Sequence, residues 1–276
     1  MGLIVVELNV GLPNGTVCHL TSESMRPLAK YLRWEIFKRG RYTRVGFELR
    51  PSDTVVDIGG NIGVFVLWAA PQVPQGSVVS VEPNPVSLGC LQLNIERNGL
   101  SNVTAMQAAA GSDGGTMQLV YHPGWEMMAY NAELSAPWFY KQSVPARLVR
   151  WIIAGLTNRH IAAGPAQRIV TPLMSLERIL DSHGIEVVNY LKLDCEGSEF
   201  EILRNVRGGC WSRIERAVIE YHEFGRDRRV AELVSILEDH GFEVEVHQSL
   251  FEKLGRPFGA SIGEIWASKP VTASSH

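Results

Sequence analysis

Short apolar segments of strand length alternate with segments of helical length along most of this chain. Residues 54–58 and 77–81 are rich in valine, as buried strands are, and residues 62–70 and 86–98 have the length and apolar spacing of helices. Further strands are predicted at residues 102–108, 116–121, 169–173, 187–193 and 217–221, and further helices at residues 175–182, 198–205 and 227–240. This alternation predicts an α/β fold with a mostly parallel sheet.

The last two predicted strands have a different connection. Residues 242–247 and 262–268 both have strand-like patterns, and no helix is predicted between them. A short connection without a crossover helix favours antiparallel pairing. We therefore expect these two strands to form an antiparallel pair at one edge of the sheet.

The first fifty residues precede the alternating region. Residues 3–10 and 16–20 predict two short strands around a turn, and residues 23–38 predict an amphipathic helix with its apolar side inward. We expect residues 1–50 to form an N-terminal extension that packs on, or closes over, a main domain of residues 51–270.

A long segment, residues 122–168, interrupts the alternation. It contains aromatic residues, paired methionines and one predicted helix at residues 146–156. A loop of this length in a compact α/β fold is usually functional, and aromatic rings and thioethers build adaptable apolar pockets. We expect a lid and a pocket for a small acceptor molecule, but the segment would equally suit a helical subdomain core. It could also join copies of the chain, as could residues 1–50.

The first strand of the main domain leads into a glycine-rich turn. The sequence Val-Val-Asp-Ile-Gly-Gly-Asn-Ile-Gly at residues 55–63 predicts a buried strand, a tight turn and a helix start. Gly59, Gly60 and Gly63 leave the turn without side chains, so a ligand can touch its backbone. Glu82 follows the next strand, where a carboxylate can accept both hydroxyls of a ribose. The sequence therefore predicts a nucleoside cofactor, although many α/β proteins have such a turn without one.

The spacing of the glycines distinguishes between two classes of cofactor. Dinucleotide enzymes use Gly-x-Gly-x-x-Gly to bind a pyrophosphate, whereas this chain has Gly-Gly-x-x-Gly, with Asn61 in place of a glycine and Asp57 ahead of the turn. An acid so close to the turn would repel a pyrophosphate and would suit an ammonium group, held directly or through water. S-adenosyl-L-methionine has a ribose, a cationic amine and no phosphate. We therefore favour it over a nicotinamide cofactor, and a methyltransferase over a nicotinamide-dependent oxidoreductase.

Charge and composition exclude several other classes. The net charge is −3, the isoelectric point is about 6.3 and no Lys/Arg block stands out, so we expect no nucleic-acid partner. No apolar run is long enough to cross a bilayer, and residues 1–10 lack the basic start of a signal peptide, so we expect no membrane association. The four cysteines, at positions 18, 90, 195 and 210, form no CxxC pair, which is typical of reduced thiols in a cytoplasmic protein.

Polar side chains gather at the ends of two predicted strands. Lys192 and Asp194 share a face of one strand, Glu196 follows in the turn, and Glu220 and His222 share a face of the other. In open α/β sheets, ligands bind beyond the carboxyl ends of the strands, so these residues are candidates for chemistry. Lys192 and Glu220 could instead form an ion pair, and His222 could be a hydrogen-bonded core histidine.

Four segments together resemble the FkbM-type family of S-adenosylmethionine-dependent methyltransferases. They are Asp-Ile-Gly-Gly-Asn-Ile-Gly at residues 57–63, Val-Glu-Pro-Asn-Pro at 81–85, Leu-Lys-Leu-Asp-Cys-Glu-Gly-Ser-Glu at 191–199 and Ile-Glu-Tyr-His at 219–222. The resemblance covers about residues 49–268, and its most specific element is Asp-x-Glu-Gly-x-Glu. It implies a class I methyltransferase fold, which is Rossmann-like with a seven-stranded sheet, and O-methylation of a hydroxyl on a sugar or secondary metabolite.

The resemblance also implies roles for individual residues around the cofactor. Asp57, Gly59, Gly60 and Asn61 would line its methionine side, and Glu82 would hold its ribose. The end of the third strand, at Gln107 and Ala108, would border the adenine. Gly63 and Asn84 lie within the same motifs and complete the expected cofactor-binding set.

A hydroxyl acceptor needs a base to remove its proton as the new bond forms. We expect His222 to be that base, with Glu196 as the second choice, and Asp194 to fix the cofactor amine or to orient the base. We expect Glu199 to begin a helix, where an acid interacts favourably with the dipole. A divalent metal held by Asp194 with His222 or Glu223 is the competing mechanism, but the Asp-Asn pair usual in such enzymes is missing, so no metal is expected.

Overall fold

A computed structural model describes residues 8–121, 129–132, 166–195, 197–223, 228–248 and 261–270. Glu196, the helix predicted at residues 146–156 and nearly all of the 122–168 segment lie outside these residues, as does the start of the strand predicted at residues 3–10. The lid function of that segment and the base function of Glu196 therefore stay predictions.

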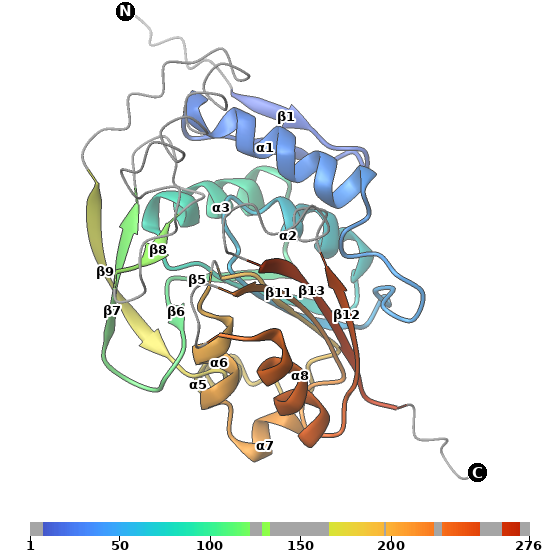
Figure 1. Cartoon of the computed structure of the whole chain (residues 1–276). Helices are drawn as coiled ribbons and strands as arrows, with labels where there is room; N and C mark the ends of the chain where they lie inside the picture. The colour runs from blue at the N-terminus through green and yellow to red at the C-terminus, as the bar shows by residue number, and fades with distance from the viewer. Residues whose placement is uncertain are drawn as a thin grey trace, which may run out of the picture.

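The central layer is a seven-stranded sheet (Figure 1). Its strands, in spatial order, are β12 (Glu243–Gln248), β13 (Ser261–Ser268), β11 (Arg216–Glu223), β10 (Tyr190–Leu193), β3 (Thr54–Ile58), β4 (Ser77–Val81) and β5 (Val103–Met106). The five strands from β11 to β5 are parallel, while β13 is antiparallel to both β11 and β12. The mostly parallel sheet and the antiparallel pair at its edge are both confirmed, and the reversed strand β13 is the second from the edge.

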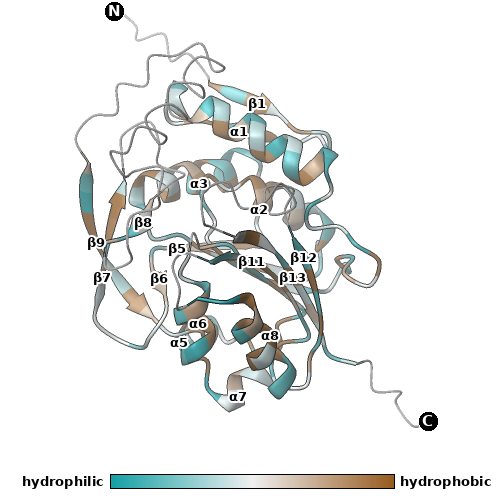
Figure 2. Cartoon of the chain, in the orientation of Figure 1, coloured by the Kyte–Doolittle hydropathy of each residue, from teal (hydrophilic) through white to brown (hydrophobic). Residues whose placement is uncertain are grey.

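Helices cover both faces of this sheet (Figure 1). One face carries α1 (Arg26–Arg33), α2 (Val64–Ala69) and α3 (Pro85–Arg97), with the 3-10 turns η1 (Glu23–Met25) and η3 (Ala70–Gln72). The other face carries α5 (Leu176–Ser182), α6 (Glu199–Asn205), α7 (Gly208–Trp211) and α8 (Val230–Asp239). Hydrophilic and hydrophobic residues both occur along α1, α5 and α8 (Figure 2), and residues such as Leu233 and Leu237 of α8 are buried. These helices are therefore amphipathic, as helices that cover a sheet are.

The period of two along each strand divides the core and also positions the polar residues. In β3, Val56 and Ile58 pack among the residues of α5 to α8, while Val55 packs among those of α1 to α3. On the α1 to α3 side the apolar positions give way to buried polar ones as each strand approaches its carboxyl end. These buried polar residues are Asp57, Ser80, Lys192 and His222, with Glu220 half-buried among them.

The N-terminal residues pack on the α1 to α3 side. Strands β1 (Asn9–Gly11) and β2 (Val17–His19) form an antiparallel hairpin, as expected from the sequence. The helix predicted at residues 23–38 is η1, α1 and a π-helical last turn, η2 (Trp34–Lys38). Gly40, with φ 68°, then turns the chain so that Arg41 and Tyr42 lie at the ends of the sheet strands.

A second, four-stranded sheet extends the fold beyond β5. Its order is β6 (Ala109–Ala110), β9 (Gln167–Met174), β7 (Thr116–Tyr121) and β8 (Tyr130–Asn131). Strand β7 pairs antiparallel with β9; both were predicted as strands, whereas β6 and β8 are too short to give a sequence pattern. In the part of the chain that the structure describes, no helix combines the length and the apolar character needed to cross a bilayer.

Candidate active site

A cavity of about 330 Å³ lies at the carboxyl ends of the parallel strands. Strand ends and their loops supply one side, which includes Gly59, Gly60, Asn61, Glu82, Ala108, Lys192, Asp194, Glu220 and His222. The N-terminal residues supply a second side with Leu28, Tyr31, Leu32, Glu35, Ile36, Arg41 and Tyr42, and strand β7 supplies Met117 and Leu119. Residues far apart in the sequence thus enclose one space.

The glycine-rich turn owes its glycines mainly to close packing within the protein. A Cβ on Gly59, which has φ 89°, would lie 1.9 Å from the carbonyl oxygen of Asp194, and one on Gly63 would lie 2.7 Å from Leu91. Gly59 and Gly60 also line the cavity, whereas Gly63 is not among the lining residues. Because Gly59 has no side chain, the turn can pack directly against the backbone of Asp194 at the end of β10.

Glu82 is buried at the cavity wall, where its two carboxylate oxygens organise the loops around it. Oε2 accepts the N–H of Asn61 and Oε1 accepts the N–H of Asn84, both at 2.8 Å. Burial raises the pKa of Glu82 to about 7, although these two hydrogen bonds act in the opposite direction. Each oxygen keeps a lone pair that could accept a hydroxyl, so the geometry fits a bound ribose.

Asn84 acts on the cavity only through its neighbours. Its side chain caps α3 by accepting the N–H of Val86, and its own backbone N–H holds Glu82. Gln107 is exposed and is not a lining residue, whereas its neighbour Ala108 is buried and lines the cavity. Of the two residues expected to border the adenine, the structure brings only Ala108 to the cavity.

Asp57 is fully buried, and a lysine neutralises it. Lys192 Nζ lies 2.8 Å from Asp57 Oδ1 and donates to the carbonyl oxygen of Gly59 at 2.9 Å, while Ser80 donates to Asp57 Oδ2 at 2.7 Å. Although burial favours the neutral amine, the Asp57 carboxylate raises the pKa of Lys192 to about 12. Asp57 is not among the residues that line the cavity, so its expected role toward the cofactor amine, directly or through water, stays a prediction. It supports the turn through Lys192.

His222 is buried at the end of β11 and is oriented by Glu199, the first residue of α6. The Glu199 Oε1 atom lies 3.1 Å from His222 Nδ1 and also accepts the backbone N–H groups of Cys195, at 2.9 Å, and Gly197, at 3.2 Å. A carboxylate beside Nδ1 favours the tautomer with its proton there. The other ring nitrogen, Nε2, lies 4.0 Å from Glu220 Oε1.

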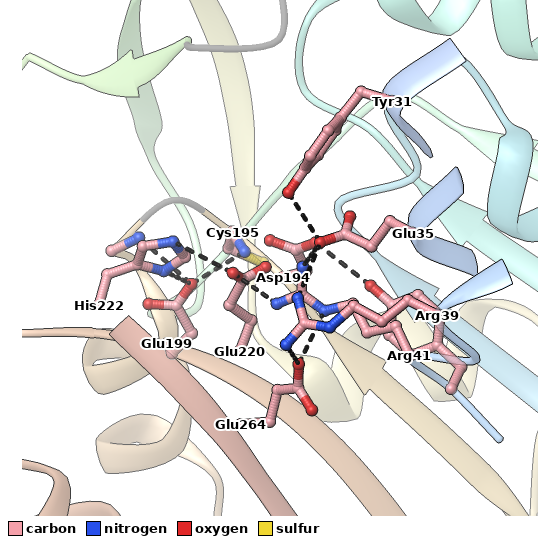
Figure 3. Close-up of polar contacts among 12 residues, drawn as sticks. Tyr31, Glu35, Arg39, Arg41, Asp194, Cys195, Glu199, Glu220, His222 and Glu264 are labelled. Carbon is pink, nitrogen blue, oxygen red and sulfur yellow. Dashed lines mark hydrogen bonds and ion pairs between the residues drawn. The ribbon is translucent and has the colours of Figure 1, made fainter. Parts of the chain in front are cut away.

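Arg41 brings a buried positive charge to the same cluster (Figure 3). Its guanidinium contacts the carboxylates of Glu35, of Glu220, at 2.5 Å, and of Glu264, at 3.3 Å. Tyr31 donates to Glu35 at 2.8 Å and so joins the wall of the cavity to this network. The ion pair considered between Lys192 and Glu220 therefore does not form, because each has another partner.

Asp194 and Glu220 form a coupled pair of acids beside His222. Although burial favours the neutral acid, the charges of Lys192 and Arg41 keep the pKa of Asp194 below its usual value. Burial and the nearby Asp194 carboxylate raise the pKa of Glu220 to about 8. Of the two acids, Asp194 is thus the one that favours the ionised form and Glu220 the one that binds a proton more readily.

Comparison with known proteins decides the class of this site. The methyltransferase FkbM domain matches residues 57–244, a range that includes the glycine-rich turn, Glu82, Asp194 and His222. The 31-O-demethyl-FK506 methyltransferase FkbM of Streptomyces tacrolimicus is 32% identical over 252 residues, which are 88% of this chain and 92% of that protein. The chain belongs to the FkbM methyltransferase family.

Two further proteins are also similar to this chain. Methyltransferase sdnD of Sordaria araneosa is 28% identical over 225 residues, which are 78% of this chain and 83% of that protein. The crystal structure of methyltransferase FkbM from Methylobacillus flagellatus is 14% identical, covers 90% of this chain and 56% of that one, and has a TM-score of 0.49. Membership of the FkbM family makes this enzyme a methyltransferase with S-adenosyl-L-methionine as its methyl donor, as the resemblance implied.

The metal-dependent alternative has a donor set in this FkbM-family site. Ligand atoms of Asp194, Glu220 and His222 all lie within 4.8 Å of one another. Arg41 already holds Glu220, however, and a guanidinium there competes with a cation for the same carboxylate. Glu223, the other ligand considered, accepts the N–H of Val230 at 2.7 Å and so supports the start of α8.

Sequence reasoning missed two features of this site. Glu199 was expected only to begin a helix, and it also orients His222. Arg41 and Tyr42 were not expected in the site at all, although Arg41 holds Glu220, and Tyr42 donates to Asp194 at 3.4 Å. The Asp-x-Glu-Gly-x-Glu motif contains the signal for Glu199, whereas no local pattern distinguishes Arg41 from the other arginines nearby.

Proposed function

We propose that this methyltransferase transfers the methyl group of S-adenosyl-L-methionine to a hydroxyl oxygen of a small molecule, with His222 as the general base. The FkbM relative is named for 31-O-demethyl-FK506, a small molecule that lacks an O-methyl group. The cavity of about 330 Å³ is of a size suited to small molecules, and its far walls are mainly apolar. Both points support a small hydroxylated acceptor.

The contact between His222 and Glu199 is the observation that carries this proposal. Two backbone N–H groups fix Glu199 Oε1, which lies 3.1 Å from His222 Nδ1. With its proton held on Nδ1, the imidazole can accept a proton at Nε2. A base that is itself oriented by a third group is a recurrent arrangement in enzymes that activate a nucleophile.

The donor side of the cavity consists of the turn at Gly59 to Asn61 and the carboxylate of Glu82. When bound, S-adenosyl-L-methionine supplies a methyl group already activated by a sulfonium. The protein then mainly has to hold the acceptor oxygen in line with that methyl group, which can contribute several orders of magnitude to the rate. Asp194, which is fixed beside Gly59 and Tyr42, would position the acceptor between the turn and His222.

The acceptor side is formed by segments outside the motifs of the family. Leu32 and Ile36 from the N-terminal helix face the same space as Met117 and Leu119 from β7, with Tyr31 at the polar end. These walls suit an apolar or glycosylated molecule. We propose that residues 122–168 form a lid. Slower cleavage of this segment by a protease when S-adenosylhomocysteine and an acceptor are both present would support this role.

A methyl-transfer assay with tritiated S-adenosyl-L-methionine and a library of hydroxylated compounds tests the proposal. His222→Ala should leave the affinity for S-adenosylhomocysteine unchanged and should lower turnover by at least about a hundredfold. His183→Ala is the matched control, because His183 caps α5 and is not a lining residue. Turnover of His222→Ala near that of the unmodified enzyme would remove His222 from the mechanism, and transfer only to nitrogen or carbon acceptors would exclude O-methylation.

A further inference from the structure

The central positive charge of the acid cluster comes from outside the sheet. Arg41 follows the π-helix η2, and its side chain is 7% exposed. Figure 3 shows its guanidinium between the carboxylates of Glu35, Glu220 and Glu264, with Asp194 beside them. One side chain thus neutralises acids that come from a helix and from two strands.

Without Arg41 this cluster would have the composition of a cation site. Asp194, Glu220 and His222 can bring two carboxylate oxygens and one imidazole nitrogen within 4.8 Å of one another. Mn²⁺ and Mg²⁺ prefer oxygen ligands, and Mn²⁺ also accepts imidazole. In metal-assisted transfer such a cation neutralises the acids and binds the reacting oxygen.

We infer that Arg41 takes the place of a divalent cation in this site, holding the acid cluster in position and excluding metal ions from it. Its Nη2 lies 2.5 Å from Glu220 Oε1, so the guanidinium occupies the carboxylate that a cation would need. Its fixed positive charge also repels a second cation at this short range. Arg41 contacts the acids and not the reacting atoms, so it is a positioning residue. The inference rests on the proposed function, in which His222 rather than a metal removes the hydroxyl proton.

Titration with Mn²⁺, monitored by electron paramagnetic resonance, tests this inference directly. The unmodified enzyme should bind no Mn²⁺ at about 100 µM, in the range of weak protein sites, and should keep its activity in EDTA. Arg41→Met should create a site with a Kd below about 100 µM, and Arg41→Met combined with His222→Ala should lose it again. Arg41→Lys keeps the charge and should keep Mn²⁺ out.

Arg39→Met is the matched control. Arg39 lies 3.6 Å from Glu264 and 3.9 Å from Glu35, but it does not contact Glu220 and is 46% exposed. The Arg39→Met variant loses one positive charge near the cluster, but Arg41 still holds Glu220, so the variant should bind no Mn²⁺. Mn²⁺ binding by Arg39→Met as tight as that by Arg41→Met would show a general charge effect and would overturn the inference.

Two other results would also overturn it. One is tight Mn²⁺ binding by the unmodified enzyme with activity lost in EDTA. The other is an Arg41→Met variant that is folded by circular dichroism and binds no Mn²⁺. If Arg41→Met does not fold, the measurements on the unmodified enzyme decide the question. Tritium transfer is followed in the same samples, so an enzyme that transfers methyl groups but needs Mn²⁺ overturns the role of Arg41, whereas failure to methylate any hydroxyl overturns the proposed function.

Discussion

The ammonium of Lys192 lies 2.8 Å from a carboxylate oxygen of Asp57, and both side chains are buried. The parallel register places these two residues directly opposite each other on β10 and β3. Because Lys192 also donates to the carbonyl oxygen of Gly59, this ion pair fixes the glycine-rich turn that lines the cavity. A buried ion pair between two neighbouring strands thus supports the turn that follows one of them.

Removal of Lys192 should therefore destabilise the fold strongly. In Lys192→Met the Asp57 carboxylate stays buried without its partner, which typically costs about 3–5 kcal/mol of unfolding free energy. The control is Arg204→Met, which breaks the exposed pair of Arg204 with Glu232 and should cost less than about 1 kcal/mol. Urea denaturation of both variants measures the difference. Equal stabilities would show that the buried pair contributes no more than an exposed one.

A methyl group on Gly59 should separate two effects of the glycine-rich turn. Gly59→Ala introduces a Cβ that would lie 1.9 Å from the carbonyl oxygen of Asp194, in a backbone with φ 89°. The control is Gly114→Ala, which has φ 85° and no atom within 4 Å, so it tests backbone strain alone, about 1–2 kcal/mol.

We expect Gly59→Ala to lose more stability than Gly114→Ala and about a hundredfold in kcat/KM, because displacement of the turn misaligns the reacting atoms. Gly114→Ala should keep kcat/KM unchanged. Thermal denaturation and the tritium-transfer assay measure the two effects. A Gly59→Ala enzyme as active as Gly114→Ala would mean that the turn can move away from Asp194 without harm to catalysis.

Local sequence patterns correctly predicted several of the strands that surround this site and the strand face on which its polar residues lie. Strands β3, β4 and β7 have the predicted bounds because each is an apolar or alternating run between turn residues. The period of two correctly placed Glu220 and His222 on one face of β11. Such patterns depend only on neighbouring residues, so they can be recognised without knowledge of the tertiary structure.

Partners that come from distant segments could not be predicted in the same way. Lys192 lies between β3 and β11, and only the register shows that Asp57 and Val218 are its neighbours, with Glu220 one step beyond. The contact of Tyr42 with Asp194 spans 152 residues and depends on how the N-terminal helix turns at its end. The sequence predicted that the N-terminal residues pack on, or close over, the main domain, but no local pattern indicates which of them reach the strand ends.

The pKa of Glu82, together with its proposed contact with the ribose, predicts that donor binding depends on pH. In the free enzyme this pKa is about 7, raised by burial, and ribose hydroxyls that donate to the carboxylate would favour its ionised form. Binding below pH 7 therefore requires loss of a proton, so affinity should fall by up to about tenfold for each pH unit below 7 and should level off above it.

Calorimetric titration with S-adenosylhomocysteine between pH 6 and pH 8, in buffers of different ionisation enthalpy, measures both the affinity and the proton released. Glu82→Gln should bind more weakly and should lose this pH dependence, because an amide does not titrate in this range. A pH-independent affinity of the unmodified enzyme with no proton release would mean that Glu82 keeps its proton in the complex.

The role of Glu199 can be separated from its position at the start of α6. Glu199→Gln replaces the carboxylate beside His222 Nδ1 with an uncharged amide, so the imidazole loses the partner that fixes its tautomer and stabilises its protonated form. We expect kcat to fall by about 10²-fold, within the range of acid–base contributions, with the KM for the methyl donor unchanged. Glu201→Gln is the control, because Glu201 lies in the same helix and pairs with Arg228 on its outer side. If both variants lose kcat equally, the helix and not the contact with His222 is responsible.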